Sequence, residues 1–380
     1  MSRGQDAGWQ LRSLASLGTY LNGFAFKPQH WGENGLPIVR IRELLDPTVE
    51  PDRYEGPAAK SFLIEDGDLI FSWSATLAVL FWNRGPAYLN QHLFKVTPVP
   101  DVNVRFLHHL INFHLDRLAA MSHGTTMKHV TRGDLDHYLV WLPGLDEQRR
   151  IADVLDALDD RIAASSSLIA KLRGAENGMT ASLLAPALGI GLVGNDTPPP
   201  RAPAGWRVGA LGTFCTLQRG FDITQAEQRK GLYPVISSSG ITSHHDQFMV
   251  DGPGVVTGRK GSLGGVYYCE GPFWPHDTSL WVKDFHGNDP EFIALLLRSL
   301  RLERFDAATS VPTLNRNTVH PFLVAVPTLN EQKSIVSIVE GFSVRTRTEE
   351  GSLTKLRHIK IGLLDDLLTG RVRVPEEVAS

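Results

Sequence analysis

The chain has 380 residues, of which 42% are hydrophobic and 21% are charged, and its formal net charge is −3. This composition supports a folded core and excludes a largely disordered protein. The near-neutral balance gives no overall basic surface for nucleic acid, although a local basic surface remains possible. Two cysteines, Cys215 and Cys269, make neither a disulfide framework nor a zinc site.

The sequence predicts no membrane-spanning helix. Its longest apolar stretch, residues 181–194, is shorter than a bilayer requires and is interrupted by Pro186 and glycines. The N-terminal residues lack the apolar segment of a signal peptide. We therefore expect a cytoplasmic protein with no membrane partner.

The chain is a tandem repeat. Residues 9–24 match residues 206–221, and residues 142–151 (LPGLDEQRRI) match residues 326–335 (VPTLNEQKSI). The spacing between matching positions falls along the chain from 197 to 186 and then to 184. A second copy with shorter loops explains this decrease, so the sequence indicates a duplication of one structural plan.

Each copy begins with short β-like runs separated by Gly, Pro, Asp and Asn. The runs lie at 69–73, 77–82 and 93–97 in the first copy and at 255–257, 265–269 and 280–282 in the second. A short helix is expected around 105–120 and again around 291–304. This pattern predicts a mixed α+β domain in each copy.

A long helix ends each copy. Mostly apolar residues recur at alternating intervals of four and three residues from 151 to 183 and again from 335 to 367. A 3.5-residue period indicates a coiled-coil seam, and about 40 residues at 1.5 Å each give a rod of about 60 Å. Two ordinary core helices are the alternative.

Several residues in these helices carry further expectations. Asp146 and Asn330 are expected to cap the two starts. Gly178 and Gly362 share one repeat position, where glycine is costly, and we interpret them as a close helix crossing. Ser165 and Glu349 place polar side chains in the seams, where they are expected to fix the register.

The predicted fold class is α+β: two globular α/β domains joined by two long antiparallel coiled-coil helices, with an internal pseudo-two-fold repeat. The expected parts are a first domain (1–143), a first helix (144–185), a Pro/Gly linker (186–205), a second domain (206–327), a second helix (328–370) and a tail (371–380).

Motifs for catalysis are missing from the sequence. Gly189-x-Gly191-x-x-Gly194 matches a dinucleotide fingerprint by letter but lies in the linker, and residues 257–265 lack the ending of a phosphate loop. The chain has no Gly-x-Ser-x-Gly elbow and no His-Glu-x-x-His pair. We predict a binding protein with no catalytic, cofactor-binding or metal-binding residues.

A duplicated chain can match the symmetry of duplex DNA. Proteins with two-fold symmetry bind DNA sites that consist of two half-sites. The long helices would set the distance between the two domains that bind these half-sites. Because the copies differ in sequence, the two half-sites are expected to differ as well.

The sequence resembles the specificity subunit of type I restriction–modification systems over residues 9–371. The resemblance rests on five segments, which are the two boundary motifs at 142–151 and 326–335, GTTMKHV at 124–130, TGRKGSLGG at 257–265 and LLTGR at 367–371. It implies two target-recognition domains and two spacer helices that read a bipartite, asymmetric site on double-stranded DNA.

The resemblance also implies partners. Two modification (methyltransferase) subunits would carry S-adenosylmethionine and methylate adenine, and restriction/translocase subunits would use ATP and Mg. None of these cofactors would bind this chain. The alternative is a non-catalytic assembly scaffold that does not read DNA.

Reading bases requires side chains such as Arg or Lys for guanine and Asn or Gln for adenine, whereas phosphates accept from any donor. The DNA contacts expected in the first copy are Thr125, Thr126, Lys128, His129, Arg132, Ser72, Ser74, Arg40 and Arg42. Those expected in the second are Arg259, Lys260, Ser262, Ser238, Ser310, Thr313, Asn315 and Arg316. Exposed loops without function are the alternative. For the equivalent triplets at 90–92 and 276–278, structural hydrogen bonding and base reading both stay open.

Overall fold

The computed structural model describes residues 8–56, 60–121, 129–188, 202–306 and 311–375. These residues belong to two compact units: unit 1 combines residues 1–166 with 352–380, and unit 2 contains residues 167–351. Each of the two long helices contributes one part to each unit. Among the described residues, no helix combines the length and apolar character that a bilayer crossing requires.

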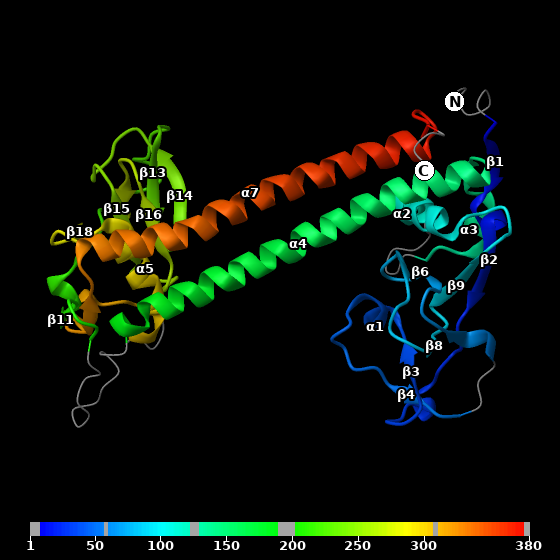
Figure 1. Ribbon diagram of the computed structural model, residues 1–380, viewed down its shortest axis with the longest axis horizontal. Helices are drawn as coiled ribbons and strands as arrows, with labels where there is room; N and C mark the ends of the chain where they lie inside the picture. Colours follow the sequence, from blue (N-terminus) through cyan, green and yellow to red (C-terminus); the bar gives the residue numbers. More distant parts are fainter. Residues whose placement is uncertain (1–7, 57–59, 122–128, 189–201, 307–310, 376–380) are drawn as a thin grey trace. The chain divides into compact units, whose positions relative to one another are not determined.

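Among its described residues, unit 1 contains three sheets and five helical segments (Figure 1). Its strands are β1 (Gln10–Ser13), β2 (Gly18–Asn22), β3 (Leu36–Val39), β4 (Arg53–Tyr54), β5 (Leu63–Ile64), β6 (Leu69–Ser72), β7 (Ala78–Phe81), β8 (Ala87–Leu89), β9 (Leu93–Pro98) and β10 (Leu139–Leu142). Its helices are α1 (Ile41–Leu45), α2 (Val104–Met121), α3 (Arg132–His137), the first part of α4 (Leu145–Leu188) and the last part of α7 (Leu329–Leu368), with short 3₁₀ turns η2 (Leu14–Leu17), η3 (Pro28–His30) and η4 (Lys60–Phe62).

Unit 2 repeats this plan with fewer small elements (Figure 1). Its strands are β11 (Arg207–Ala210), β12 (Thr216–Arg219), β13 (Tyr233–Ser237), β14 (Gly240–His245), β15 (Gly254–Gly258), β16 (Val266–Cys269), β17 (Trp274–Pro275), β18 (Ser279–Asp284) and β19 (Leu323–Val326). Its helices are the last part of α4, α5 (Pro290–Ser299), α6 (Arg316–Val319) and the first part of α7, with 3₁₀ turns η5 (Leu211–Thr213) and η6 (Leu302–Phe305).

The sheets of the two units follow the same order. An antiparallel sheet runs β2-β9-β6-β7 in unit 1 and β12-β18-β15-β16 in unit 2. A parallel pair, β3 with β8 and β13 with β17, lies in a second sheet of each unit. The strand that opens each copy pairs with the strand that precedes the long helix, β1 with β10 and β11 with β19.

The strand registers confirm the duplication residue by residue. Asn22 faces Phe94 in unit 1, and Arg219 faces Leu280 in unit 2. These pairs differ by 197 and 186 positions, which are the offsets of the sequence repeat. A shift of the strand pairing by one residue would move every side chain to the opposite face of the sheet. The two copies have therefore kept the same register.

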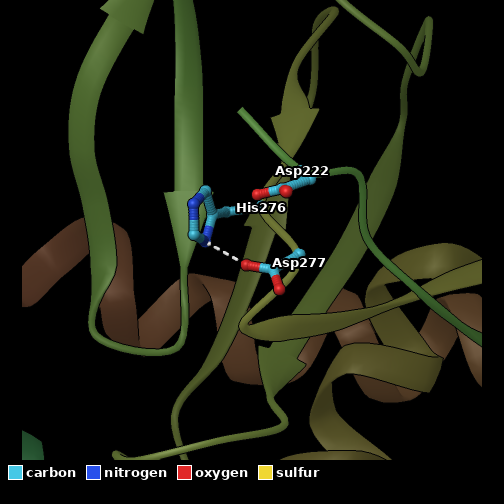
Figure 2. A group of neighbouring side chains, drawn as sticks. All are labelled: Asp222, His276 and Asp277. Carbon is cyan, nitrogen blue, oxygen red and sulfur yellow. Dashed lines mark ion pairs between the residues drawn. The ribbon is translucent and has the colours of Figure 1, made fainter. Parts of the chain in front are cut away.

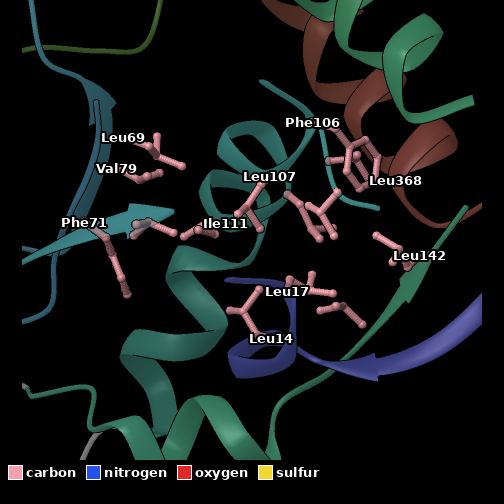
Figure 3. Close-up of a cluster of buried hydrophobic side chains, with 14 of the residues drawn as sticks. Leu14, Leu17, Leu69, Phe71, Val79, Phe106, Leu107, Ile111, Leu142 and Leu368 are labelled. Atoms are coloured by element: carbon pink, nitrogen blue, oxygen red, sulfur yellow. The ribbon is translucent and has the colours of Figure 1, made fainter. Parts of the chain in front are cut away.

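The core of unit 1 lies between its antiparallel sheet, helix α2 and the ends of both long helices (Figure 3). Phe71 from β6 and Leu107 from α2 are fully buried in it. Leu368, from the end of α7, belongs to the same cluster as Phe106 and Leu142. The first domain therefore needs residues from the end of the chain to complete its core.

The core of unit 2 is built in the same way from the other ends of the helices. Phe292 and Ile293 of α5 are buried against Val255 of β15. Leu184, from the end of α4, and Ile335, from the start of α7, are buried in this cluster as well. Each globular domain thus packs against both long helices.

The boundary motif ties each long helix to its domain. Trp9 donates its indole N–H to Glu147 at 3.2 Å, and Trp206 donates to Glu331 at 3.1 Å. Gln148, which follows Glu147, is completely buried and donates to the carbonyls of Asp101 and Pro143. The glutamate and glutamine of this motif therefore have structural roles.

Within each unit the two long helices run antiparallel, as predicted. In unit 1, Ile151 and Leu155 share a core with Leu367, and Asp159 pairs with Lys360. In unit 2, Arg173 pairs with Glu350 at 2.5 Å, and Ser343 donates to Glu176 at 2.6 Å. Residue numbers rise along α4 as they fall along α7 in both places.

Every predicted seam position except Met179 is buried or half-buried. The buried seam positions are Ile151, Leu155, Ser165 and Ile169 in α4 and Ile335, Val339, Thr346, Leu353 and Leu367 in α7. Met179 is 39% exposed, in keeping with the drift of a straight helix away from a 3.5-residue period. Glu349 is half-buried, and its role with Ser165 in fixing the register stays a prediction.

Two expectations about these helices are wrong. A Cβ at Gly178 or at Gly362 would meet no described atom within 4 Å, so these glycines do not mark a close crossing. The helices begin at Leu145 and Leu329, which places Asp146 and Asn330 inside the first turn. The cap of α7 is Thr328, whose hydroxyl accepts from the N–H of Glu331 at 3.4 Å.

The first helix is also longer than predicted. It runs through Pro186 to Leu188, three residues beyond the expected end at residue 185. A proline near the end of a helix removes few hydrogen bonds. Leu184 and Ala187 are both fully buried in the core of unit 2, and their burial offsets the loss.

Candidate nucleic-acid interface

Two loops of unit 2 meet beside the end of strand β15. The backbone N–H groups of Arg259 and Lys260 both donate to the carbonyl of Thr278, at 2.9 and 3.0 Å. Lys260 also forms a β-bridge with Thr313, and the N–H of Leu314 donates to the carbonyl of Arg259 at 2.8 Å. The glycine-rich loop and the 311–316 segment, far apart in sequence, thus form one surface.

This surface is hollowed into a depression of about 840 Å³. Four of the predicted contact residues line it: Arg259, Thr313, Asn315 and Arg316. The other polar residues of the lining are Gln218, Arg219 and Asp222, which sequence reasoning missed. Arg219 lies 58 residues before Asp277, and only the pairing of β12 with β18 brings these two residues together.

Three arginine side chains are anchored around the depression. Arg219 donates to a carboxylate oxygen of Asp277 at 2.8 Å, and Arg259 donates to the Asp277 backbone carbonyl at 3.1 Å. Arg316 donates to the carbonyl of Leu217 at 3.3 Å. Each of these bonds occupies one nitrogen of a group with five N–H donors. The arrangement can therefore offer donors to an anionic or base-bearing ligand.

Figure 2 shows His276 and Asp277 next to Asp222, which lines the depression. Their ligand-type atoms all lie within 4.8 Å of one another, a spacing that a metal ion could bridge. However, His276 Nδ1 is 2.9 Å from the Thr278 hydroxyl and 3.2 Å from Asp277, and Arg219 already neutralises Asp277. The chemistry of this group fits an arginine-carboxylate pair better than a metal centre.

His320 connects the Arg316 segment to strand β12. Its Nε2 accepts from the N–H of Leu217 at 2.9 Å, which requires that this nitrogen carry no proton. Burial and the nearby charge of Arg316 lower the pKa of His320. The neutral imidazole therefore holds this side of the depression in place at neutral pH.

Gly258 allows the glycine-rich loop to turn back on itself. A Cβ at this position would lie 1.9 Å from the carbonyl oxygen of Ser262. Lys260 and Ser262 are exposed on the loop, as expected for contact residues. Ser238 is buried beside a second, smaller hollow of about 440 Å³ that Thr278 and His276 also line.

In unit 1 the equivalent loops meet in the same way. Ser74 forms a β-bridge with His129, and its hydroxyl lies 3.0 Å from His129 Nδ1. Ser72 donates to the carbonyl of Thr76 at 2.7 Å. Both serines are buried, so neither offers a free hydroxyl to a ligand at the surface.

One arginine occupies the same place in both copies. Arg132 is the first residue of α3 and Arg316 is the first residue of α6, and both side chains are exposed. Thr131 caps α3 by accepting from the N–H of Asp134, and Asn315 caps α6 by accepting from the N–H of Asn317. Asn315 has thus a structural role in addition to any contact it makes.

The remaining predicted residues are dispersed. Arg40 pairs with Asp52 at 2.8 Å and stacks over Trp31, and Arg42 pairs with the buried Glu43 at 2.8 Å. Their charges are therefore largely balanced within unit 1. Thr125, Thr126, Lys128 and Ser310 lie outside the described residues.

Comparison with known proteins gives one family. A family model described as the type I restriction modification DNA specificity domain matches residues 7–173 and 203–358. The specificity subunit of the type I restriction enzyme EcoBI from Escherichia coli is 32% identical over 153 residues. That match covers 40% of this chain and 32% of the relative, so the chain aligns with about a third of that protein's length.

Two solved structures share the fold. The S subunit of a type I restriction–modification system from M. genitalium has a TM-score of 0.64 at 17% identity, covering 97% of this chain and 98% of that one. A chain from a study of complex assembly and conformational transition in the type I R-M system has a TM-score of 0.61 at 18% identity, covering 96% and 98%. At these identities the likeness establishes the fold alone.

Proposed function

Because this chain belongs to the family of type I restriction modification DNA specificity domains, we propose that it recognises the DNA sequence for a type I restriction–modification complex. The observation that carries this proposal is that the family model matches both copies of the repeat. In this proposal the chain performs no catalytic step. It binds double-stranded DNA and directs adenine methylation or restriction by its partners.

The recognised site is proposed to be bipartite and asymmetric. Residues 1–143 form the first target-recognition domain and residues 206–327 the second. Residues 144–185 and 328–370 are the spacers, 186–205 the linker and 371–380 the tail. Equivalent loop positions carry different side chains, Ser74 in one copy and Lys260 in the other, which supports two different half-sites.

The partners follow from the family proposal. Two modification subunits would bring S-adenosylmethionine, and restriction/translocase subunits would bring ATP and Mg, all in the cytoplasm. Because the chain has a net charge of −3, we expect it to bind DNA weakly by itself. The assembled complex should bind specifically, with a strong dependence on salt.

A map of adenine methylation in the host, with and without this reading frame, tests the proposal. We expect one asymmetric, two-part motif to disappear when the reading frame is deleted. Exchanging residues 206–327 for those of a relative should change one half of the motif and leave the other. If no motif disappears while a methyltransferase still co-purifies with the chain, the assembly scaffold replaces this proposal.

A further inference from the structure

The ion pair between Arg219 and Asp277 has no counterpart in unit 1. Arg219 is the last residue of β12, and Asp277 lies in the turn before β18. The equivalent positions in unit 1 are Asn22, at the end of β2, and Gln91. Asn22 donates from its side chain to the Gln91 backbone carbonyl at 2.9 Å.

The fold does not need this ion pair. Phe24 bridges Asn90 in unit 1 just as Phe221 bridges His276 in unit 2, and the strand registers agree. Unit 1 builds the same strand end with neutral amides. Exposed ion pairs also add little stability, and the Arg219 side chain is 57% exposed. The pair therefore calls for an explanation other than folding.

The chemistry of the pair suits the recognition of a base. Asp277, with its side chain only 23% exposed, accepts from one nitrogen of Arg219 and holds the guanidinium in the depression. Within the described residues the other nitrogens of Arg219 have no partner. Four N–H donors of the fixed guanidinium remain, and two parallel ones among them match the O6 and N7 acceptors of guanine in the major groove.

The other two arginines of the depression differ in their anchors. Arg259 and Arg316 bind backbone carbonyls, through contacts of 3.1 and 3.3 Å. Only Arg219 is oriented by a carboxylate, so both partners of its bond are charged, and its contact of 2.8 Å is the shortest of the three. Arg259 and Arg316 suit the backbone phosphates, which need donors but no fixed orientation.

We propose that Arg219, oriented by Asp277, reads a guanine in the half-site bound by residues 206–327. This inference rests on the proposed function and adds to it one base and one reading residue. It states that this half-site contains a G·C pair whose recognition depends on Arg219. Asp277 acts as a positioning residue, because it contacts Arg219 and not the base.

The test uses the chain in complex with its modification subunits, in a host without other adenine methylation. Methylation motifs are mapped for the wild type and for the variants Arg219→Gln, Arg219→Lys and Asp277→Asn. Arg229→Gln is the matched control, because Arg229 forms a similar exposed pair with Asp246 at 3.0 Å in the same unit, outside the lining of the depression. Equilibrium binding of each purified complex is then measured on duplexes that carry every single-base change in the half-site.

We expect Arg219→Gln to lower discrimination at one G·C pair by roughly ten- to a hundredfold, with the other half-site unchanged. Arg219→Lys should lose part of this discrimination, and Asp277→Asn should lose less than Arg219→Gln. Arg229→Gln should behave as the wild type.

Three results would overturn the inference while leaving the proposed function in place. They are a half-site without a G·C pair, full discrimination in Arg219→Gln, and an equal loss of affinity for every duplex. The last result would assign Arg219 to a phosphate. If deletion of the wild-type chain removes no motif, the proposed function itself fails.

Discussion

The side chain of Gln332 donates to the backbone carbonyl of Pro327, five residues earlier, at a distance of 2.9 Å. It also donates to the side chain of Asn288 at 2.9 Å and accepts from the N–H of Asp289 at 2.8 Å. Gln148 makes the equivalent contacts with Pro143 and other residues of unit 1. One buried amide thus joins helix, domain and boundary in each copy.

Replacing this amide should destabilise the unit that contains it. Gln332→Ala leaves the half-buried N–H of Asp289 without its acceptor and removes the buried bond to the carbonyl of Pro327, and a buried unsatisfied group costs about 1–3 kcal/mol. We expect a decrease of that size in the free energy of unfolding, measured by chemical denaturation, and the same for Gln148→Ala. Gln225→Ala, at an exposed position, is the control. Equal stability of all three variants would show that the amide is dispensable.

Replacing the two helix glycines by alanine should stabilise the protein. Gly178→Ala and Gly362→Ala add a methyl group where no described atom lies within 4 Å, and alanine favours a helix by up to about 1 kcal/mol over glycine. We expect a higher melting temperature for each variant. Gly220→Ala should do the opposite, because its Cβ would lie 2.1 Å from the carbonyl oxygen of His276. A loss of stability in the helix variants would mean that the glycines are needed.

Acid should weaken unit 1 through two histidines of α2. Burial lowers the pKa of His108 to about 4, and burial with nearby Arg117 lowers the pKa of His114 to about 4. In the unfolded chain both titrate near 6.5, so between these values the unfolded state binds more protons. Stability should therefore fall as the pH drops from about 6.5 to about 4.

The double variant His108→Gln/His114→Gln tests this linkage. Its unfolding free energy should change less steeply over the same pH range than that of the wild type. His244→Gln, at an exposed position, serves as the control and should keep the wild-type slope. An unchanged slope in the double variant would assign the acid sensitivity to carboxylates.

The matched arginines at the starts of α3 and α6 should contact phosphates. Arg132→Gln and Arg316→Gln are each expected to weaken binding by the assembled complex uniformly across sequences. Each should also reduce the slope of log affinity against log salt by about 0.9. Fluorescence titrations at several salt concentrations measure this, with Arg229→Gln as the control. A change confined to one base pair would instead indicate base reading.

Much of the fold could be predicted because its signals are local or periodic. The 3.5-residue period located both long helices, and the repeat offsets reappear in pairs such as Ile38 with Tyr88 and Val235 with Trp274. Helix starts were less predictable, since a cap depends on where the backbone leaves the helical conformation. Asp146 lies inside the first turn of α4, and in the second copy Thr328 caps α7.

The candidate site was less predictable because its parts come from distant segments. Arg259, Thr313 and Arg316 were found from their residue types and do line one depression. The burial of Ser74 follows from its bridge to His129, 55 residues later, which local sequence does not reveal. Arg219 belongs to no motif, and its place in the depression beside Asp277 depends on the pairing of β12 with β18.

The place of Leu367 and Leu368 in the core of unit 1 also affects how the protein is made. Ribosomes add about 5–20 residues per second, and these leucines are added only after the whole of unit 2. The nascent first domain must wait roughly ten seconds or more with one side of its core uncovered. Unit 2 is contiguous in sequence and can close first. The half of the molecule that is translated first is therefore the half that finishes folding last.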